Sequence, residues 1–195
     1  MVETCQIPNL DEIYAQHFDG PGRFVEVGAY DGFMYSNTYH LAQAGWEGLY
    51  IEPVLDFFLR CQHNHRDHNV RVLNAACSNY NGDIDLYQGP DIYSANGEMV
   101  KGKTVTVPCY MLDNVLFYMD WRERFELLVI DVEFHEKEVL QGFSLAKWKP
   151  KMVIIEAHES HENRAYALNA DFINHFFRSY KKIYSDHINN IYVRD

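Results

Sequence analysis

A glutamate inside an apolar run, followed by two glycines, is the stretch of the sequence whose residue types and spacing best suit a chemical role. It lies within residues 24–32, where Glu26, Gly28 and Gly32 have the spacing E-x-G-x-x-x-G. Glycines after a strand let the backbone approach a ligand, and the N-terminus of a following helix offers unpaired N–H groups. The stretch predicts either a nucleotide-type ligand site or an ordinary strand-to-helix turn, since short glycine patterns occur in both.

The position of the acid separates two classes of ligand. A dinucleotide-binding turn has the spacing G-x-G-x-x-G, with its acid about 20 residues further along the chain. Here Glu26 already lies inside the first apolar run. A carboxylate there would repel a pyrophosphate and attract the ammonium of an amino-acid moiety. The spacing therefore favours S-adenosylmethionine over NAD as the ligand.

A second acid ends a second apolar run. Residues 49–53 read Leu-Tyr-Ile-Glu-Pro, and a helix-length segment separates Glu52 from Glu26. A carboxylate at such a strand end can accept hydrogen bonds from both hydroxyls of a ribose. Two acids at the ends of consecutive strands favour the nucleoside site over an ordinary turn.

Several stretches together resemble the FkbM family of methyltransferases in their order and spacing. The resemblance extends from about Phe24 to Glu156 and is carried by residues 26–32, 36–39, 45–48, 51–53, 73–76 and 130–133. It implies a class I methyltransferase fold that uses S-adenosylmethionine. It also implies methylation of a hydroxyl on a sugar, a glycan or another small natural product.

The resemblance further implies roles for individual residues. With Glu26, the methionine portion of the donor would lie against Gly28, Ala29, Tyr30, Asp31, Gly32 and a helix start at Ser36 and Asn37. The ribose would lie on Glu52 beside Pro53, and the adenine edge would lie along Asn74, Ala75 and Ala76. Asp131 would lie nearest the amino group and the transferring methyl.

Methyl transfer from a sulfonium is an in-line displacement, so the protein must align the reactants and remove a proton from a hydroxyl acceptor. His135 and His158 are candidate bases, because imidazole titrates near neutral pH and each histidine follows a strand end. The competing interpretation for each is an ordinary capping or structural contact. We predict that the catalytic residues are Asp131, Glu133, His135 and His158.

The same strand ends offer an alternative chemistry based on a metal ion. Asp131, Glu133, Glu156 and His158 carry oxygen and nitrogen ligands for a divalent ion such as Mg²⁺, which would lower the pKa of the acceptor hydroxyl. The family resemblance does not require a metal. Our first expectation is therefore that there is none, with Asp131, Glu156 and His158 as the alternative ligand set.

Two details of the sequence qualify this interpretation. The family pattern D-V-E-G-x-E has Phe134 in place of its glycine, so the ring either reshapes the acceptor pocket or packs beneath the following helix. A second stretch holds three histidines, His63, His65 and His68, at the end of an expected helix. We expect a solvated polar turn there, since their spacing does not easily bring three rings to one ion.

The elements that must position these residues alternate between strand and helix. The sequence predicts an α/β, Rossmann-like class I methyltransferase fold, in which right-handed crossovers make a mostly parallel sheet with helices on both faces. The family resemblance implies seven strands with an antiparallel last strand. Strands are expected at 23–27, 49–53, 70–75, 125–133, 151–157, 181–185 and 190–193. Helices are expected at 10–18, 33–44, 112–119 and 164–180, after Pro53 with Leu55, Phe58, Leu59 and Cys61 on one face, and up to Gly142.

The length of 195 residues fits one domain. We expect a single methyltransferase domain over 1–195, with a helical cap at 1–22 that lies against the sheet edge. An antiparallel insertion at 82–108 would contain a candidate lid loop at 93–103.

Composition restricts the partners. A formal net charge of −11 argues against a nucleic-acid substrate, which would be held mainly by Lys and Arg. The four cysteines have no C-x-x-C spacing, and no membrane-length apolar run or signal peptide is evident, so we expect free thiols, no membrane partner and a cytoplasmic location.

The expected partner is a small-molecule or glycan hydroxyl acceptor, and a homodimer stays open. Two other functions are weighed. A non-catalytic S-adenosylmethionine-binding module, or a subunit of a larger complex, would fit a chain with little material beyond its core fold. An NAD-dependent oxidoreductase is disfavoured by the glycine spacing and by Glu26.

Overall fold

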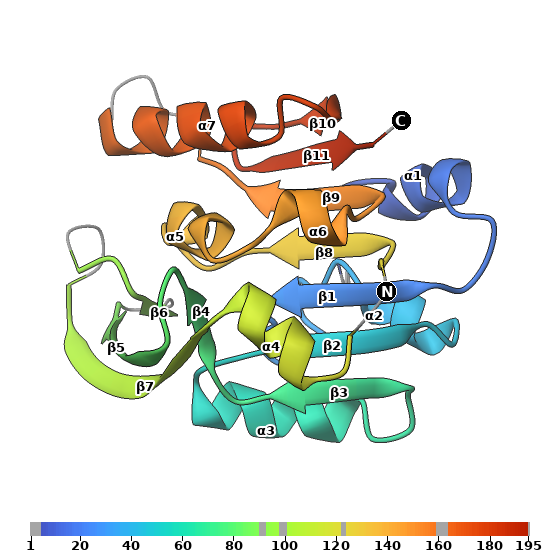
Figure 1. The fold of residues 1–195 in the computed structure, drawn as a ribbon. Coiled ribbons are helices and arrows are strands. Elements are labelled where there is room, and N and C mark those ends of the chain that lie inside the picture. Colours follow the sequence, from blue (N-terminus) through green and yellow to red (C-terminus); the bar gives the residue numbers. More distant parts are fainter. Residues whose placement is uncertain (1–4, 90–92, 98–100, 122–123, 159–163, 195) are drawn as a thin grey trace.

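The computed structural model describes residues 5–89, 93–97, 101–121, 124–158 and 164–194. Two sheets organise these residues, and Figure 1 shows the smaller sheet beside the arrowheads of β1 and β8 in the larger one. The larger sheet consists of β1 (Arg23–Val27), β2 (Glu47–Ile51), β3 (Val70–Leu73), β8 (Leu127–Ile130), β9 (Met152–Glu156), β10 (Lys181–Ser185) and β11 (Asn189–Val193).

The topology of the larger sheet confirms the predicted class I methyltransferase arrangement. Its seven strands have the order β10-β11-β9-β8-β1-β2-β3. Strands β3, β2, β1, β8 and β9 pair in parallel, and β11 is antiparallel to both of its neighbours. The predicted closing hairpin is thus present, with β11 inserted between β9 and β10.

Alternation along the buried strands divides the core into two layers, one on each face of the larger sheet. In β1, Val25 and Val27 pack into one layer, and Phe24 packs into the other. The first layer is covered by α4 (Leu112–Tyr118), α5 (Glu136–Gln141), α6 (Leu145–Trp148) and α7 (Arg164–Phe176). The second layer is covered by α1 (Leu10–His17), α2 (Tyr39–Gln43) and α3 (Leu55–Asn64).

The smaller sheet lies where an antiparallel insertion was predicted. Its order is β4-β7-β5-β6, with β4 (Ala76–Ser78), β5 (Gly82–Gln88), β6 (Tyr93–Ser94) and β7 (Lys103–Met111). Strand β5 pairs antiparallel with β6 and β7, and β4 pairs in parallel with β7. Tyr93 and Ser94, expected in a lid loop, instead form β6, while residues 98–100 of that loop lie outside the described residues.

The helix expected at 33–44 is much shorter than predicted, because it begins only at Tyr39. The Asp31 carboxylate accepts hydrogen bonds from the backbone N–H groups of Phe33 (2.9 Å) and Met34 (2.8 Å). A side chain that bonds nearby backbone donors offers the chain an alternative to the helix, which explains the turn before α2. The predicted glycine after this helix is correct, since Gly45 has φ +86° just beyond it.

Two further expectations about helix faces were wrong. On α3, Leu55 and Leu59 are exposed and only Cys61 is fully buried. The buried side of this helix is the one that contacts Gly32 in the turn after β1. Helix α1 does not lie against the sheet edge, since Leu10 and Tyr14 are buried in the second core layer.

A chain connection, the state of the cysteines and the nature of the helices add three facts. Strand β3 ends at Leu73, two residues before the end of the strand expected at 70–75, and after Asn74 and Ala75 the chain enters the smaller sheet as β4. The cysteines Cys5, Cys61, Cys77 and Cys109 are free thiols. Each helix in the described ranges is too short or too polar to span a bilayer.

Candidate active site

A cavity of about 1110 Å³ lies at the carboxyl ends of the central parallel strands. This is the edge at which open α/β sheets bind ligands. Its wall contains the turn after β1, Glu52 after β2, Asp131 and Glu133 after β8, and Glu156 at the end of β9. The structure therefore brings the predicted strand-end acids together around one cavity.

The turn after β1 requires glycine at two positions. Gly28 has φ +85°, and a Cβ there would lie 1.7 Å from the backbone oxygen of Asp131. Gly32 has φ +68°, and a Cβ there would lie 2.7 Å from the Cys61 sulfur. The left-handed conformation and the lack of space both exclude larger residues. Gly28 lines the cavity, whereas Gly32 faces α3 and lies outside the cavity wall.

A buried histidine, His65, stabilises the turn after β1 by a hydrogen bond to its backbone. A solvated polar turn was expected at this histidine tract, so that expectation was wrong for His65. His65 Nε2 lies 2.7 Å from the backbone oxygen of Gly32, and its Nδ1 lies 2.9 Å from Nδ1 of His68. Burial lowers the pKa of His65 to about 4, so the ring is neutral at pH 7 and its Nε2–H donates to Gly32. This role was missed because the sequence does not show which histidine of the tract turns inward.

Glu52 is held by backbone donors beside the cavity. One carboxylate oxygen accepts from the N–H of Tyr30 (2.9 Å) and the other from the N–H of Val54 (2.7 Å). Burial raises the pKa of Glu52 to about 7, although both hydrogen bonds favour the charged form. Each carboxylate oxygen keeps a further acceptor position, which is what a pair of ribose hydroxyls needs.

Glu26 is buried and bonded by hydroxyl groups. Its carboxylate accepts from the hydroxyl of Thr38 and from that of Ser36 at 3.3 Å. Burial raises the pKa of Glu26 to about 7, and these hydrogen bonds oppose the shift. Ser36 thus bonds Glu26 and does not start a helix, since α2 begins at Tyr39, and Thr38 is a partner that sequence reasoning missed.

Four of the residues predicted to bind the methyl donor lie outside the cavity wall: Asp31, Gly32, Asn37 and Asn74. Asn74 donates to the backbone oxygens of Glu52 and Pro53, each at 2.9 Å, and so fixes the end of β2. The backbone oxygen of Asn37 accepts from the Tyr14 hydroxyl at 2.8 Å. The cavity wall does include Ala29, Tyr30, Ser36, Pro53, Ala75 and Ala76.

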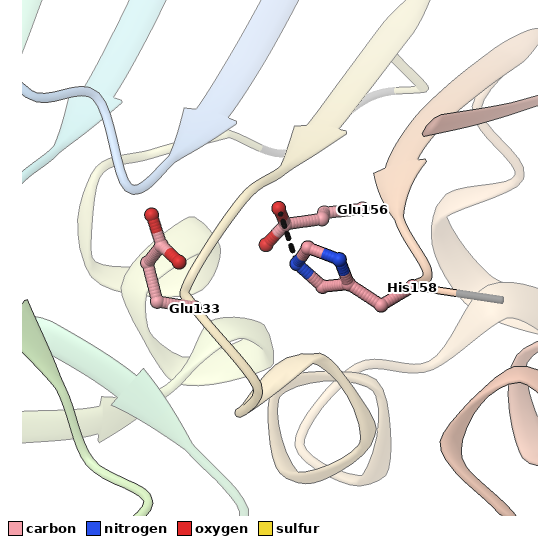
Figure 2. A group of neighbouring side chains, drawn as sticks. All are labelled: Glu133, Glu156 and His158. Atoms are coloured by element: carbon pink, nitrogen blue, oxygen red, sulfur yellow. Dashed lines mark ion pairs between the residues drawn. The ribbon is translucent and has the colours of Figure 1, made fainter. Parts of the chain in front are cut away.

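A cluster of acids with one histidine occupies the other side of the cavity. Figure 2 shows the Glu156 carboxylate beside the His158 ring, with Glu133 across from both, and one ligand atom from each residue lies within 4.8 Å of the others. His158 Nε2 lies 2.9 Å from a carboxylate oxygen of Glu156. Asp131 Oδ2 accepts from the side-chain amide of Gln6 at 3.1 Å.

Burial governs the charges in this cluster. It raises the pKa of Glu133 to about 7 and also raises the pKa values of Asp131 and Glu156. The pKa of Glu156 is raised further by the neighbouring carboxylates, Asp131 above all. Burial lowers the pKa of His158, so that an uncharged ring faces these acids near neutral pH.

Phe134 adopts a left-handed backbone conformation, which favours glycine. Its φ is +73°, and the N–H groups of Phe134 and Val132 donate to the buried Glu136 carboxylate at 3.1 and 3.3 Å. The ring stacks on His158 with centroids 4.8 Å apart and planes inclined by 29°. The ring was expected either to reshape the acceptor pocket or to pack beneath the following helix. It does neither, because it lies outside the cavity wall and against His158 of the acid cluster.

This conformation reverses the usual order of alanine and glycine. We expect Phe134→Gly to be more stable than Phe134→Ala by about 1 kcal/mol in urea unfolding, because an alanine would keep the left-handed penalty. Phe172 in α7 is the control, since glycine there should be less stable than alanine by about 1 kcal/mol. Equal stability of the two Phe134 variants would show that the backbone at 134 is unstrained.

The two candidate bases differ in position. His135 lines the cavity, with its Nε2 2.9 Å from the Ser78 hydroxyl and its Nδ1 3.6 Å from Glu138. Burial lowers the pKa of His135, which keeps the imidazole neutral and able to accept a proton. His158 lies outside the cavity wall, behind Glu156 and against Phe134.

Both ends of the described chain contribute wall residues that sequence reasoning missed. The N-terminal segment supplies Cys5, Gln6 and Pro8. Strand β10 supplies Tyr184, and the turn between β10 and β11 supplies Asp186, His187 and Ile188. An antiparallel β11 places that turn at the carboxyl ends of the parallel strands, so the predicted topology contained a signal for it. The aromatic rings of Phe57 and Tyr93 also line the cavity, and the ring centroids of Phe57 and Tyr30 lie 4.3 Å apart.

A family model described as "Methyltransferase FkbM domain" matches residues 26–184. The match confirms the resemblance found in the sequence. No curated protein matches the sequence.

Solved structures show the same fold at low sequence identity. The chain is similar to methyltransferase FkbM from Methylobacillus flagellatus KT, with 15% identity and a TM-score of 0.58, over 89% of this chain and 43% of that one. It is similar to monomeric WbdD, with 14% identity and a TM-score of 0.56, over 96% and 41%. It is also similar to the ribosomal protein L11 methylase from Lactobacillus delbrueckii subsp. bulgaricus, with 12% identity and a TM-score of 0.50, over 95% of this chain and 77% of that one. The chain spans less than half of the first two structures.

Proposed function

The chain belongs to the FkbM methyltransferase domain family, and from this premise we propose that it is an S-adenosylmethionine-dependent O-methyltransferase. The proposed acceptor is a hydroxyl of a sugar, a glycan or another small natural product. The observation that carries the proposal is the charge of the cavity wall. It contains Glu26, Glu52 and Asp131, and no lysine or arginine is found among the described residues that line it. Such a wall suits a cationic sulfonium with an ammonium group and disfavours a pyrophosphate.

The donor half of the cavity is proposed along the ends of β1 and β2. The methionine portion would lie on the turn of Gly28, Ala29 and Tyr30, with its ammonium between Glu26 and Asp131. Glu52 would accept the ribose hydroxyls, and Ala75 with Ala76 would face the adenine. Asp31, Gly32, Asn37 and Asn74 would then support the site without contacting the donor.

The acceptor half is proposed around His135. Its neutral imidazole would take the proton of the acceptor hydroxyl, whose oxygen then forms a bond to the donor's methyl carbon. The carbon–sulfur bond breaks and its electron pair returns to sulfur, which becomes a neutral thioether. The donor is already activated by its charge, so the main contributions of the protein are alignment and proton removal.

Calorimetry tests the donor half. We expect the chain to bind S-adenosylmethionine and its demethylated product, and not NAD. Binding of NAD alone would overturn the proposal. A labelled donor, offered with a panel of hydroxylated acceptors with and without Mg²⁺, then tests methyl transfer.

A second candidate function is a donor-binding module that acts within a larger assembly. The observation that favours it is the length of the chain, which covers 43% and 41% of the first two solved structures. Donor binding without transfer to any acceptor in the panel would favour this module over the complete enzyme.

Donor affinity should depend on pH through Glu26. The pKa of this buried carboxyl is about 7 in the empty protein, and an ammonium ligand favours its charged form. Affinity for S-adenosylhomocysteine should therefore rise by at least about tenfold from pH 6 to pH 8, since protons must leave before the ligand binds. In calorimetry, Glu26→Gln should reduce this rise in affinity by a factor of about ten. Any rise that persists would then come from ionisation of Glu52. A Glu26→Gln variant with the full wild-type rise would remove Glu26 from the ammonium site.

A further inference from the structure

The cavity contains a carboxylate that lacks a hydrogen-bond donor. Glu156 is only 7% exposed, and among the described residues no N–H or O–H group donates to its Oε2 atom. Asp131 faces Glu156 closely enough for the two carboxyl groups to share a proton, but an ionised Asp131 offers none. A buried, unsatisfied anion beside other anions is costly, so the group needs a proton or a cation.

The neighbouring ligand atoms already have spacings close to those of a metal shell. Two adjacent ligands of an octahedral ion with bonds of about 2.1 Å lie about 3.0 Å apart, and opposite ligands lie about 4.2 Å apart. His158 Nε2 and Glu156 Oε1 are 2.9 Å apart. One ligand atom from each of Glu133, Glu156 and His158 lies within 4.8 Å of the other two. Figure 2 shows Glu133 on the loop after β8, across from Glu156 and His158 at the end of β9. The limit of 4.8 Å exceeds the distance between opposite ligands by about 0.6 Å, so the side chains must move to close the shell.

We propose that Glu133, Glu156 and His158 bind one divalent cation of the Mg²⁺ or Mn²⁺ type at the edge of the cavity, with Asp131 as an added or water-mediated ligand. Carboxylate oxygens suit these ions, and the single imidazole favours Mn²⁺ over Mg²⁺. The stacked Phe134 ring fixes the plane of His158, as outer groups commonly do for histidine ligands.

The role of this cation rests on the proposed function, whereas its binding does not. A cation at this edge would contact the acceptor oxygen and lower the pKa of its hydroxyl. The hydroxyl proton would pass to the imidazole of His135, and the oxygen would attack the methyl group as described above. Glu26 and Glu52 would remain with the donor, on the other side of the cavity.

Paramagnetic resonance of Mn²⁺ tests the binding, because the sharp signal of free Mn²⁺ is lost on binding. The wild-type chain should bind one Mn²⁺ without any donor present. Glu156→Gln and Glu133→Gln should each weaken this binding by at least about tenfold. Asp67→Asn is the control of matched charge, since Asp67 is an exposed acid paired only with Arg66 among the described residues. It corrects for unspecific attraction of cations to a chain of net charge −11.

Two results would overturn the site. One is the absence of Mn²⁺ binding by a wild-type chain that is folded by circular dichroism. The other is equal Mn²⁺ affinity of Glu133→Gln, which alters a partly exposed residue and should fold, and of Asp67→Asn. Calorimetry with S-adenosylhomocysteine in the presence of a chelator reports the donor site separately. Its failure would count against the proposed function and not against the cation site.

Discussion

Replacing Glu52 with alanine should weaken binding of S-adenosylhomocysteine by roughly tenfold to a hundredfold. The ribose hydroxyls would lose their proposed acceptor, and an unpaired buried polar group costs about 1–3 kcal/mol. The variant also removes the acceptor of the Tyr30 and Val54 N–H groups, which hold the turn after β1 against the end of β2. Calorimetry measures the affinity directly.

Two further variants separate charge from position in this test. Asp56→Ala removes an exposed acid from the first turn of α3 without touching the cavity wall, and it should bind like the wild type. Glu52→Gln keeps the shape of the side chain and should bind more weakly than the wild type, because one acceptor oxygen becomes a donor group. Unchanged affinity of Glu52→Ala would remove Glu52 from the site.

Replacing Gly28 with alanine should lower the free energy of unfolding by about 2–5 kcal/mol. A left-handed backbone costs a non-glycine residue about 1–2 kcal/mol. The added Cβ would also lie 1.7 Å from the Asp131 backbone oxygen, so the ends of β1 and β8 must move apart, and overpacking of this kind costs about 1–3 kcal/mol. Urea unfolding measures the loss.

Gly45 provides the control for this variant. Its φ of +86° matches that of Gly28, but no atom lies within 4 Å of the position of an added Cβ. Gly45→Ala should therefore show the backbone penalty alone, about 1–2 kcal/mol. Equal losses for the two variants would mean that the contact with Asp131 is relieved without cost.

The sequence predicted the fold well where physical patterns are local. The apolar run of β9, and that of β1 with Glu26 inside it, are typical of strands buried on both faces, and their positions were correct. Parallel strands bring their carboxyl ends to one edge, which is why the sequence predicts Glu52 and Asp131 at the same site. The family resemblance added the antiparallel β11.

The misses have different physical causes, and only one of them is a contact between distant residues. The helix after the glycine turn was overextended because the cap formed by Asp31 competes with helical hydrogen bonds, and propensity alone does not show this. The inward turn of His65 depends on Gly32, which lies far away in the sequence. The exposed Leu59 shows that an apolar residue at helical spacing need not face the core.

The backbone hydrogen bonds between the strand ends have a consequence for the thermodynamics of ligand entry. The N–H groups of Gly28 and Ala29 already donate to Ile51, and that of Asp131 donates to Val27. These segments are ordered in the empty protein, so occupancy would remove little conformational entropy from the chain. The site is therefore preorganised, and we expect only a modest change in backbone conformational freedom when a ligand binds at this edge.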